Sequence, residues 1–511
     1  MNTLWIYVLC ISRISAEDIH LDLPLGHGRE LGKHKLSDGH VEQLYEIPNP
    51  GQFWEKYASK GTPVVFKDAA KNFPAFELWT DEFLIRHYGN LEVKLESKKE
   101  KNKIPIGEKG LGRDTIRSYL NDYKSKDSYV VSQLPDPMAR DVNLLSCLSC
   151  GTFSKRIMEA NLWLSSGGTS SLLHRDADNA INCLLNGTKD WILIHPKHED
   201  KIPIAQGDKG YGGFATLDVD NVNLIKYSDF KHVPWQYANL TAGDCLFLPY
   251  GYWHQVRSYG TKNMAVSVLF SRLKEFSATG CNRTEYTSIP LSNANMIWTY
   301  PGHGPQTLGN SDPFDLRDGL AEMVLDLENK NKKFDSADFL FEWFTKADLL
   351  EEEDERRSVA TLIYEELKIS TNGAMSSDSI RNLSIEMLKS LAMLIEGDPA
   401  NSEEYEHAVF TPDEIGQMIK KTLAQNSGKF SHEMLSKSYQ NLGGSEHIAR
   451  ELFFDMDKDE NGVVTEEEVS QTLKDVLNKF EKKYNHDPSN DYYRGELEKD
   501  KEMMEKIHNE L

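Results

Sequence analysis

The stretch SSLLHRDADNAINCLLNGTKDWILIHP, residues 170–196, contains the features on which the interpretation of the chain depends. Two apolar runs typical of β-strands flank an Asn-Gly pair, which predicts a hairpin tip at Asn186. His174 and Asp176 lie two residues apart, so in a strand both side chains would face the same side of the sheet. Lys189 adds a third ionisable group on the second run. Because burying unpaired charges is costly, this pattern indicates a functional site.

A third member of that site is expected from GDCLFLPYGYWHQV, residues 243–256, in which His254 follows an apolar run and a Pro-aromatic turn. Two imidazoles and one carboxylate on one face form the ligand set that suits non-haem Fe(II) and leaves coordination positions open. An H-x-D pair alone arises often by chance, and its plain alternative is a core histidine hydrogen-bonded to the neighbouring aspartate. The sequence predicts an iron centre formed by His174, Asp176 and His254.

Three blocks of the chain together resemble the JmjC family of Fe(II)- and 2-oxoglutarate-dependent dioxygenases. They are TPVVFKDAAKNFPAFELWTDEFLIRHYGN (62–90), NLWLSSGGTSSLLHRDADN (161–179) and LTAGDCLFLPYGYWHQV (240–256). The resemblance implies a double-stranded β-helix, which is a JmjC or cupin-like jelly roll, with Fe(II) held by the three ligands named above. It also implies 2-oxoglutarate and O₂ as co-substrates and a protein or peptide as substrate.

The resemblance further implies which residues hold 2-oxoglutarate. Many JmjC proteins have a lysine at the offset of Lys189 from the first histidine ligand, where it pairs with the far carboxylate; a lysine that reaches solvent from the strand edge is the alternative. Where related hydroxylases have an asparagine, this chain has Ala180, so Asn179 and Asn182 are candidates for that role. The other matches to the co-substrate pocket are Tyr129, Ser171 and Ser267, while Trp163 matches an aromatic residue that core packing explains equally well.

The pattern from about residue 40 to 275 predicts an all-β unit. Short β-runs alternate there with turns that contain Gly, Pro and Asn, which suits an antiparallel barrel or jelly roll. Flanking helices are predicted over 52–60 and 80–88. Residues 94–103, dense in Lys and Glu, are predicted to form a solvated hairpin or loop rather than a nucleic-acid-binding patch. After about residue 310 the apolar residues recur with helical periodicity, which predicts a separate α-helical domain.

A calcium-binding loop is predicted within that helical part at 457–468, DKDENGVVTEEE. Its oxygen-bearing residues follow the spacing of an EF-hand loop, with glycine at the sharp turn. Because EF-hands usually occur in pairs, a partner is expected. The segments 327–338, 368–379 and 403–414 keep fragments of the pattern and are candidates for degenerate hands that bind no calcium. The predicted ligands of Ca²⁺ are Asp457, Asp459, Asn461, Val463 through its carbonyl, Thr465 and Glu468.

Composition bounds the remaining possibilities. A length of 511 residues suggests more than one domain, and 39% hydrophobic residues indicate a globular chain. A formal net charge of −22 argues against nucleic acid as the main partner, because phosphate contacts need a basic surface. We expect a signal peptide at 1–16, a JmjC-type dioxygenase domain at 17–275, a linker at 276–312, an α-helical EF-hand-like domain at 313–500 and a tail at 501–511.

Both ends of the chain resemble targeting signals. The N-terminus MNTLWIYVLCISRISAED has an apolar run, too short to span a bilayer, before small residues that end at Ala16, which predicts a secretory signal peptide. The final residues HNEL resemble the KDEL class of retention signals. Together they predict the lumen of the endoplasmic reticulum, with no membrane span. The sequons at Asn186, Asn239, Asn282 and Asn382 are then candidate glycosylation sites.

The cysteines fit the same compartment. Cys147 and Cys150 form a C-x-x-C pair, for which a local structural disulfide is the plain interpretation and a redox-active pair the alternative. Cys183 and Cys245 lie inside apolar runs and are predicted to be buried thiols.

The expected function is a lumenal Fe(II)- and 2-oxoglutarate-dependent oxygenase that hydroxylates protein side chains and carries a calcium-binding module. Hydroxylation is preferred because a lumenal enzyme has no access to nucleosomes. Two alternatives stay open: an N-methyl demethylase, which would release formaldehyde, and a catalytically weak JmjC-like calcium-binding accessory protein. The complete ligand set and Lys189 favour the enzyme, whereas the alanine at position 180 favours the accessory protein.

Overall fold

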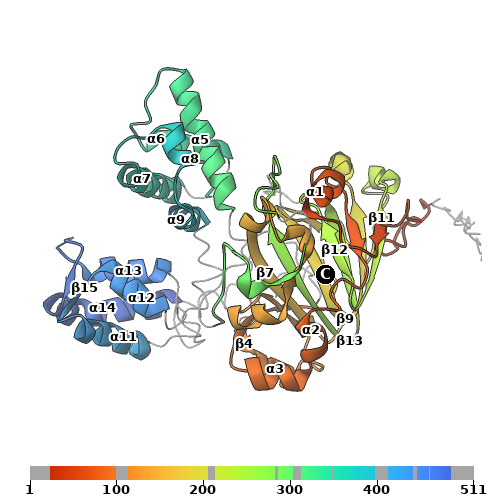
Figure 1. Ribbon diagram of the computed structural model, residues 1–511, viewed down its shortest axis with the longest axis horizontal. Helices are drawn as coiled ribbons and strands as arrows, with labels where there is room; N and C mark the ends of the chain where they lie inside the picture. Colours follow the sequence, from red (N-terminus) through yellow and green to blue (C-terminus); the bar gives the residue numbers. More distant parts are fainter. Residues whose placement is uncertain are drawn as a thin grey trace, which may run out of the picture.

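The structure is a computed structural model that describes residues 23–98, 113–204, 213–281, 286–302, 312–347, 349–350, 353–396, 412–440, 446–459 and 461–484. A β-rich unit is followed along the chain by two groups of helices (Figure 1). Within the described part of the chain, no helix has the length and apolar character needed to cross a membrane. The predicted signal peptide, the HNEL tail, the sequon at Asn282 and most of the candidate hand at 403–414 lie outside the described residues.

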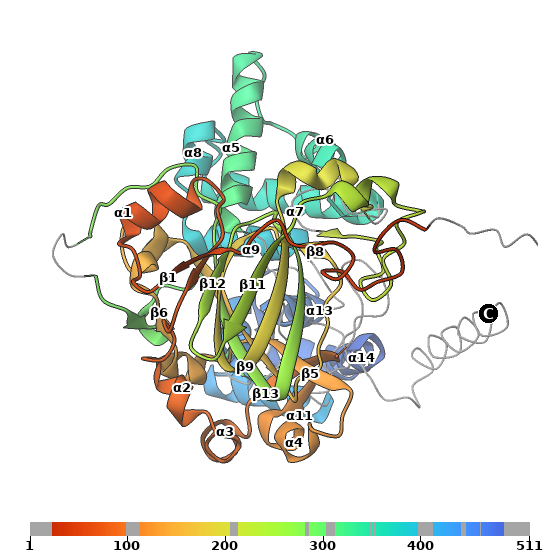
Figure 2. The ribbon, with the colours of Figure 1, turned by 90° about the vertical axis from the view of Figure 1, so that its right-hand side faces the viewer.

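A twelve-stranded sheet spans the β-rich unit. Its two longest strands, β9 (Asn179–Ile194) and β13 (Trp253–Phe270), pair antiparallel. β12 (Cys245–Leu248) pairs with β9 on the side away from β13 (Figure 2). β7 (Ile157–Ser165) pairs with β13. The remaining strands are β1 (Glu42–Leu44), β2 (Val64–Phe66), β3 (Glu92–Ser97), β4 (Arg113–Thr115), β5 (Ser128–Gln133), β8 (His174–Arg175), β10 (Gly213–Phe214) and β11 (Gln236–Thr241).

Short helices cover one face of this sheet, and their starts are set by local chemistry. Thr80 accepts a hydrogen bond from the backbone N–H of Phe83 at 3.1 Å, which caps a helix over Asp81–Tyr88. The predicted all-β unit with flanking helices is therefore confirmed. The α-helices are α1 (Pro50–Phe53), α2 (Pro74–Leu78), α3 (Asp81–Tyr88) and α4 (Ile116–Asp122); a π-helical turn covers Trp54–Ala58, and 3₁₀ turns cover Asp136–Asp141, Ser146–Leu148, Phe153–Lys155, Pro196–Lys201 and Ser228–His232.

The residues predicted as a solvated hairpin or loop at 94–103 begin inside a strand. Lys94 lies in β3 and is only 5% exposed, and Leu95 pairs with Val130 of β5. The prediction of solvent exposure was wrong for Lys94 and Leu95, because both residues are buried in this strand. The rest of the predicted loop, from residue 99 onward, lies outside the described residues.

Successive residues of β9 face two different hydrophobic clusters. Ile181, Cys183 and Leu185 belong to the large core beneath the helices. Leu184 points to the opposite face, as strand alternation requires. We call the group on that face the interior cluster; it comprises Val41, Val65, Leu184, Trp191, Leu193, Ala238, Leu240, Leu246, Leu248, Tyr252 and Ala265, with Trp163 and Val256 packed against it.

The Asn-Gly pair does not form the predicted hairpin. β9 continues through Asn186 and Gly187, and its pairing with β13 shifts register between Tyr259 and Met264. Gly187 has φ +84°, and a Cβ atom there would lie 2.6 Å from Nδ2 of Asn263. Only glycine accommodates both the positive φ and this close approach, so the pair forms a bulge within one long strand.

The bulge decides which residues of β9 face inward. Before it, the even-numbered Leu184 belongs to the interior cluster; after it, the odd-numbered Trp191 and Leu193 do. An extra residue in one strand changes the alternation by one position. Lys189, two residues before Trp191, therefore lies on the inward face, and it is 7% exposed.

The cysteine predictions were wrong. Cys150 bonds to Cys281, with Cα atoms 5.2 Å apart, rather than to its neighbour in the C-x-x-C pair. Cys147 is a free, buried thiol. Cys183 and Cys245 are joined by a disulfide because β9 and β12 are neighbours in the sheet and place these two residues opposite each other.

Residues 276–302, where described, pack onto the β-rich unit rather than forming a free linker. The backbone N–H groups of Ile297 and Trp298 donate to the carbonyls of Ile157 and Met158 at 2.9 and 2.8 Å. The strand β14 (Ile289–Pro290) pairs with β6 (Asn143–Leu144), and a 3₁₀ turn follows at Leu291–Asn293.

The helical half forms two separate cores. The first packs against Met158, Ile297 and Trp298 of the β-rich unit. The second is self-contained. The first core comprises α5 (Pro313–Asn329), α6 (Asp338–Ala347), α7 (Glu353–Ser370), α8 (Ser377–Arg381) and α9 (Ile385–Glu396); the second comprises α11 (Pro412–Gln425), α12 (His432–Gln440), α13 (Glu446–Met456) and α14 (Glu466–Tyr484).

The predicted calcium loop pairs through a short strand with a segment that the sequence pattern did not single out. The short strand β16 (Val464–Thr465), at the end of that loop, pairs with β15 (Lys429–Phe430), which lies between α11 and α12. The candidates 327–338 and 368–379 are turns between helices of the first core. The partner escaped detection because its turn is short and has no carboxylate, so it shares no ligand pattern with an EF-hand loop.

Candidate active site

Two neighbouring strands bring the three predicted iron ligands together. His174 of β8 pairs directly with His254 of β13, and their ring centroids are 4.1 Å apart. Asp176 follows β8, and its carbonyl accepts a hydrogen bond from the N–H of Gly251 at 2.8 Å. The Asp176 carboxylate lies 3.9 Å from Nε2 of His174 and 3.7 Å from Nε2 of His254. All three ligand atoms therefore lie within 4.8 Å of one another.

Backbone carbonyls orient both imidazoles. Nδ1 of His174 lies 2.9 Å from the carbonyl of Leu172, and Nδ1 of His254 lies 2.9 Å from that of Tyr252. A carbonyl only accepts, so each Nδ1 donates its proton, and Nε2 is the ring nitrogen that faces the Asp176 carboxylate. Burial, reinforced by the neighbouring His174, lowers the pKa of His254 to about 4. His254 thus presents a neutral nitrogen donor, and Nε2 of His174 lies beside the same carboxylate.

Aromatic side chains hold these rings from two sides. Phe214 stacks on His174 at 5.6 Å, and Trp191 stacks on His254 at 5.7 Å between centroids. The side chains of His254 and Asp176 differ in exposure, 3% against 43%. The ligand group is consequently packed on the His254 side and open to solvent on the Asp176 side, where a reactant can approach.

Lys189 lies inside the β-rich unit without a described anionic partner. Its ammonium group lies 5.8 Å from the centroid of the Trp163 ring. Burial alone lowers the pKa of Lys189 to about 8. A buried cation without a counter-ion is unfavourable, so this site is suited to an anionic ligand.

Beside Lys189, three of the residues matched to the co-substrate pocket form one hydrogen-bonded chain. Nε1 of Trp163 donates to Oγ of Ser267 at 3.1 Å, and Nδ2 of Asn182 donates to the same oxygen at 2.6 Å. Tyr129 stacks on Trp163 at 6.5 Å. Asn182 has a buried Oδ1 atom with no described hydrogen-bond partner. These side chains thus line one polar region of the interior.

The other two predicted pocket residues are engaged with the backbone. Oγ of Ser171 accepts from the N–H of Val256 at 2.9 Å, which leaves its own proton free to donate. Asn179 accepts from the N–H of Tyr250 and donates to the carbonyl of Ser271, both at 3.2 Å. Asn179 therefore fixes the turn that precedes His254, whereas Asn182 faces the polar region beside Lys189.

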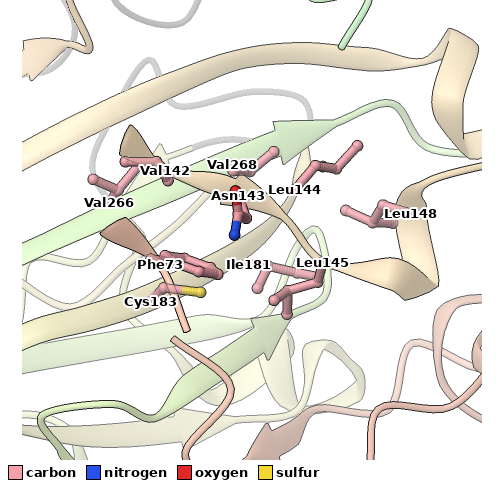
Figure 3. Close-up of a pocket in the computed structure, with 10 residues that line it drawn as sticks. All are labelled: Phe73, Val142, Asn143, Leu144, Leu145, Leu148, Ile181, Cys183, Val266 and Val268. Atoms are coloured by element: carbon pink, nitrogen blue, oxygen red, sulfur yellow. The ribbon is translucent and has the colours of Figure 1, made fainter. Parts of the chain in front are cut away.

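An apolar pocket behind β9 is a separate feature. Figure 3 shows Phe73, Ile181 and Cys183 facing a space that is lined almost entirely by carbon. Its residues belong to the large core on the other face of β9, so it is not part of the ligand group.

A second group of carboxylates lies in the helical half. Asp457, Asp459 and Glu468 place one oxygen each within 4.8 Å of the others. The N–H of Gly462 donates to Asp457 at 2.9 Å, and Gly462 has φ +79°, which glycine adopts easily. Thr465 donates its hydroxyl to Glu468 at 2.8 Å. Asn461 and Val463 lie on the same loop, so all six predicted calcium ligands belong to one turn.

The fold and the ligand group define a cupin-like domain. Residues 50–276 match the family model described as a cupin-like domain. The match covers the β-rich unit, and the relatives that are similar to the same part of the chain include proteins named for a JmjC domain and lysine-specific demethylases.

Several curated proteins are similar to part of the chain. JmjC domain-containing protein D of Dictyostelium discoideum is 26% identical over 259 residues, which cover 45% of this chain and 55% of that protein. Jumonji C domain-containing protein 5 of Drosophila melanogaster is 23% identical over a segment that covers 43% of this chain and 57% of that protein. Lysine-specific demethylase 8 of Danio rerio is 22% identical over a segment that covers 41% of this chain and 54% of that protein. The chain thus spans little more than half the length of these relatives.

Proposed function

We propose that this chain is an Fe(II)- and 2-oxoglutarate-dependent oxygenase that hydroxylates protein side chains. The observation that carries the proposal is the convergence of two imidazole nitrogens and one carboxylate within 4.8 Å, in the same interior as a buried lysine. This donor set suits Fe(II) and leaves coordination positions open. His174, Asp176 and His254 would hold the iron, which when bound would activate O₂ with the oxidative decarboxylation of 2-oxoglutarate.

The residues of the chain supply binding and orientation for this chemistry. Lys189 would pair with the far carboxylate of 2-oxoglutarate, because a dicarboxylate in a closed interior needs a fixed cation. Asn182 and Ser267 fix the adjoining polar surface through their 2.6 Å hydrogen bond. The carbonyls that hold Nδ1 of both histidines keep the metal-binding nitrogens in place before any ligand arrives.

Protein hydroxylation is favoured over demethylation by the proposed address of the chain. We propose that the protein resides in the lumen of the endoplasmic reticulum. The signal-like N-terminus and the HNEL tail support this location, and so do two disulfides, because such bonds persist in oxidising compartments. A second candidate is an N-methyl demethylase, which the names of several relatives favour. The accessory-protein alternative rested on Ala180; the position of Asn182 beside Ser267 offers a replacement amide and weakens it.

For the helical half we propose an EF-hand pair with one calcium site. The loop at 457–468 would bind Ca²⁺ through Asp457, Asp459, Asn461, the carbonyl of Val463, Thr465 and Glu468. The turn between α11 and α12 would serve as its structural partner through the β15–β16 pair.

Turnover of 2-oxoglutarate to succinate by the iron-loaded full chain tests the oxygenase proposal. We expect succinate to form with wild-type protein and not with His174→Ala. Mass spectrometry of lumenal proteins should then find residues that gain one oxygen only when His174 is intact, whereas released formaldehyde would identify a demethylase. A loaded protein that neither binds nor consumes 2-oxoglutarate, with or without candidate peptides, would contradict the enzyme.

Glycan analysis tests the proposed address. Asn186, Asn239 and Asn382 are exposed, so each is accessible to glycosylation. We expect the protein made in a secretory host to lose mass on treatment with an N-glycosidase, and deletion of HNEL to release it into the medium. If the protein without HNEL stays in the cells and its mass does not change on treatment with the glycosidase, it is not a lumenal protein.

A further inference from the structure

Trp191 lies between the two ends of the proposed co-substrate site. It follows Lys189 by two residues on the inward face of β9, and its ring stacks on that of His254 with 28° between the planes. The side chain is 5% exposed and packs with Leu193 in the interior cluster. One residue thus contacts a metal ligand and shares a strand face with the anchoring lysine.

The indole N–H of Trp191 is buried and has no hydrogen-bond partner in the part of the chain that the structure describes. An unpaired buried donor costs free energy, and buried tryptophans usually place this group against an acceptor. The same interior holds two further polar groups without a described partner. The Lys189 ammonium has no described anion beside it, and Oδ1 of Asn182 has no described hydrogen-bond donor. The Trp191 indole N–H and the Lys189 ammonium are both donors, so an anionic acceptor would satisfy both.

Three other buried tryptophans show that an unpaired indole is not itself a site. Trp235, Trp253 and Trp298 also lack a partner for Nε1 among the described residues. The first two belong to a different apolar cluster from Trp191, and Trp298 packs with the first helical core. What distinguishes Trp191 is its position: the unpaired donor lies in the interior where a buried cation and a metal ligand are both adjacent.

We propose that Trp191 is a co-substrate-binding residue whose indole N–H donates a hydrogen bond to a carboxylate of 2-oxoglutarate. The inference rests on the proposed oxygenase function. A dicarboxylate held by Lys189 at one end and by the metal at the other would pass Trp191, which stacks on His254 and shares a strand face with Lys189. Stacking on His254 fixes the indole, so the donor needs no rearrangement when the ligand binds.

Equilibrium binding of 2-oxoglutarate to full-length protein loaded with Mn(II) tests this without turnover. Trp191→Phe keeps an aromatic ring against His254 but removes the donor. We expect it to weaken 2-oxoglutarate binding about tenfold to hundredfold, the range for a hydrogen bond to a charged group. Its Mn(II) affinity should stay unchanged, because the metal ligands are intact. Trp235→Phe is the matched control, since it removes an unpaired buried indole from the other cluster, and it should bind like wild type.

A second measurement observes the donor directly and does not depend on the variant being stable. In protein labelled with ¹⁵N-tryptophan and loaded with diamagnetic Zn(II), the indole N–H resonance of Trp191 should move downfield when 2-oxoglutarate is added. Trp235 should not respond. Equal affinities of wild type, Trp191→Phe and Trp235→Phe, or an unmoved Trp191 resonance in saturated protein, would overturn the inference alone. Failure of wild type and Trp235→Phe to bind 2-oxoglutarate would overturn the proposed function as well.

Discussion

Cys183 of β9 lies directly opposite Cys245 of β12, and a disulfide joins them with their Cα atoms 4.0 Å apart. β9 begins at Asn179, just beyond Asp176, and β12 leads into the turn before His254. The bond therefore links the two segments that supply the metal ligands, and it spans 62 residues of sequence. Closing a loop of this size in the unfolded chain is expected to stabilise the fold by about 4 kcal/mol.

Removing this disulfide should destabilise the protein. We expect Cys183→Ala combined with Cys245→Ala to lower the free energy of unfolding by about 2–4 kcal/mol in urea titration, because the unfolded chain regains its freedom. Cys147→Ala is the control, since Cys147 is buried at the same depth but unbonded, and its change should be smaller. An unaltered urea midpoint in the double variant would show that the bond is not formed in solution.

The same strands show what the sequence could and could not predict. His174, Asp176 and His254 were predicted as one group, because residue type and strand alternation restrict where such side chains are useful. The partner of Cys183 was not, since it depends on which strands are neighbours, and that is set by the whole sheet. Asn186 and Gly187 give a local turn signal, but the approach of the Tyr259–Asn263 segment makes them a bulge.

Trp191 and the β15 segment escaped prediction for related reasons. A tryptophan in an apolar run is an ordinary core residue, and only the bulge at Gly187 and the contact with His254 give it a further meaning. The β15 segment has no ligand pattern, and it is identified solely through its pairing with β16. Residues whose type and local spacing match a ligand set were predicted, including the distant His254, whereas roles that depend only on which strands are neighbours were not.

The charge of Lys189 should make 2-oxoglutarate binding sensitive to alkaline pH. Burial lowers the pKa of Lys189 from 10.5 to about 8 in the free protein, so above that pH the ammonium loses its proton before ligand binds. We expect the Kd for 2-oxoglutarate to be flat below pH 8 and to rise about tenfold per pH unit above it. Calorimetry on Mn(II)-loaded protein across pH 7–10 measures this.

Two variants separate the charge of Lys189 from its packing. Lys189→Met should weaken binding at least about hundredfold at pH 7, because the far carboxylate loses its cation. Lys189→Arg keeps a cation at all these pH values and should flatten the alkaline rise. Without ligand, Lys189 is protonated in the unfolded chain but largely deprotonated in the folded chain between about pH 8 and pH 10. The free energy of unfolding of the wild type should therefore increase with pH in this range, whereas that of Lys189→Met should not. An alkaline rise of equal slope in Lys189→Arg would assign it to another group.

Loss of one metal ligand should be distinguishable from loss of a buried histidine. We expect His254→Gln to reduce Mn(II) affinity at least about hundredfold, because a neutral nitrogen donor that Tyr252 orients is removed. His34→Gln is a matched control: His34 is also buried, 4% exposed, but it lies outside the ligand group. The titrations belong in a Glu468→Gln background, so that the loop at 457–468 does not contribute. Equal affinities in the two histidine variants would mean that His254 is not a ligand.

Calcium should bind one site per chain and stabilise the α11–α14 core. Asp457, Asp459 and Glu468 hold like charges within 4.8 Å, and Ca²⁺ relieves their repulsion. The turn between α11 and α12 has no carboxylate, so the stoichiometry should be one. We expect saturating calcium, at about 100 times Kd, to raise the stability of this core by about 2.7 kcal/mol by mass action. Glu468→Gln should abolish that gain, while Glu467→Gln, an exposed neighbour, should keep it. Strong calcium binding that survives Glu468→Gln would place a second site elsewhere in the helical half.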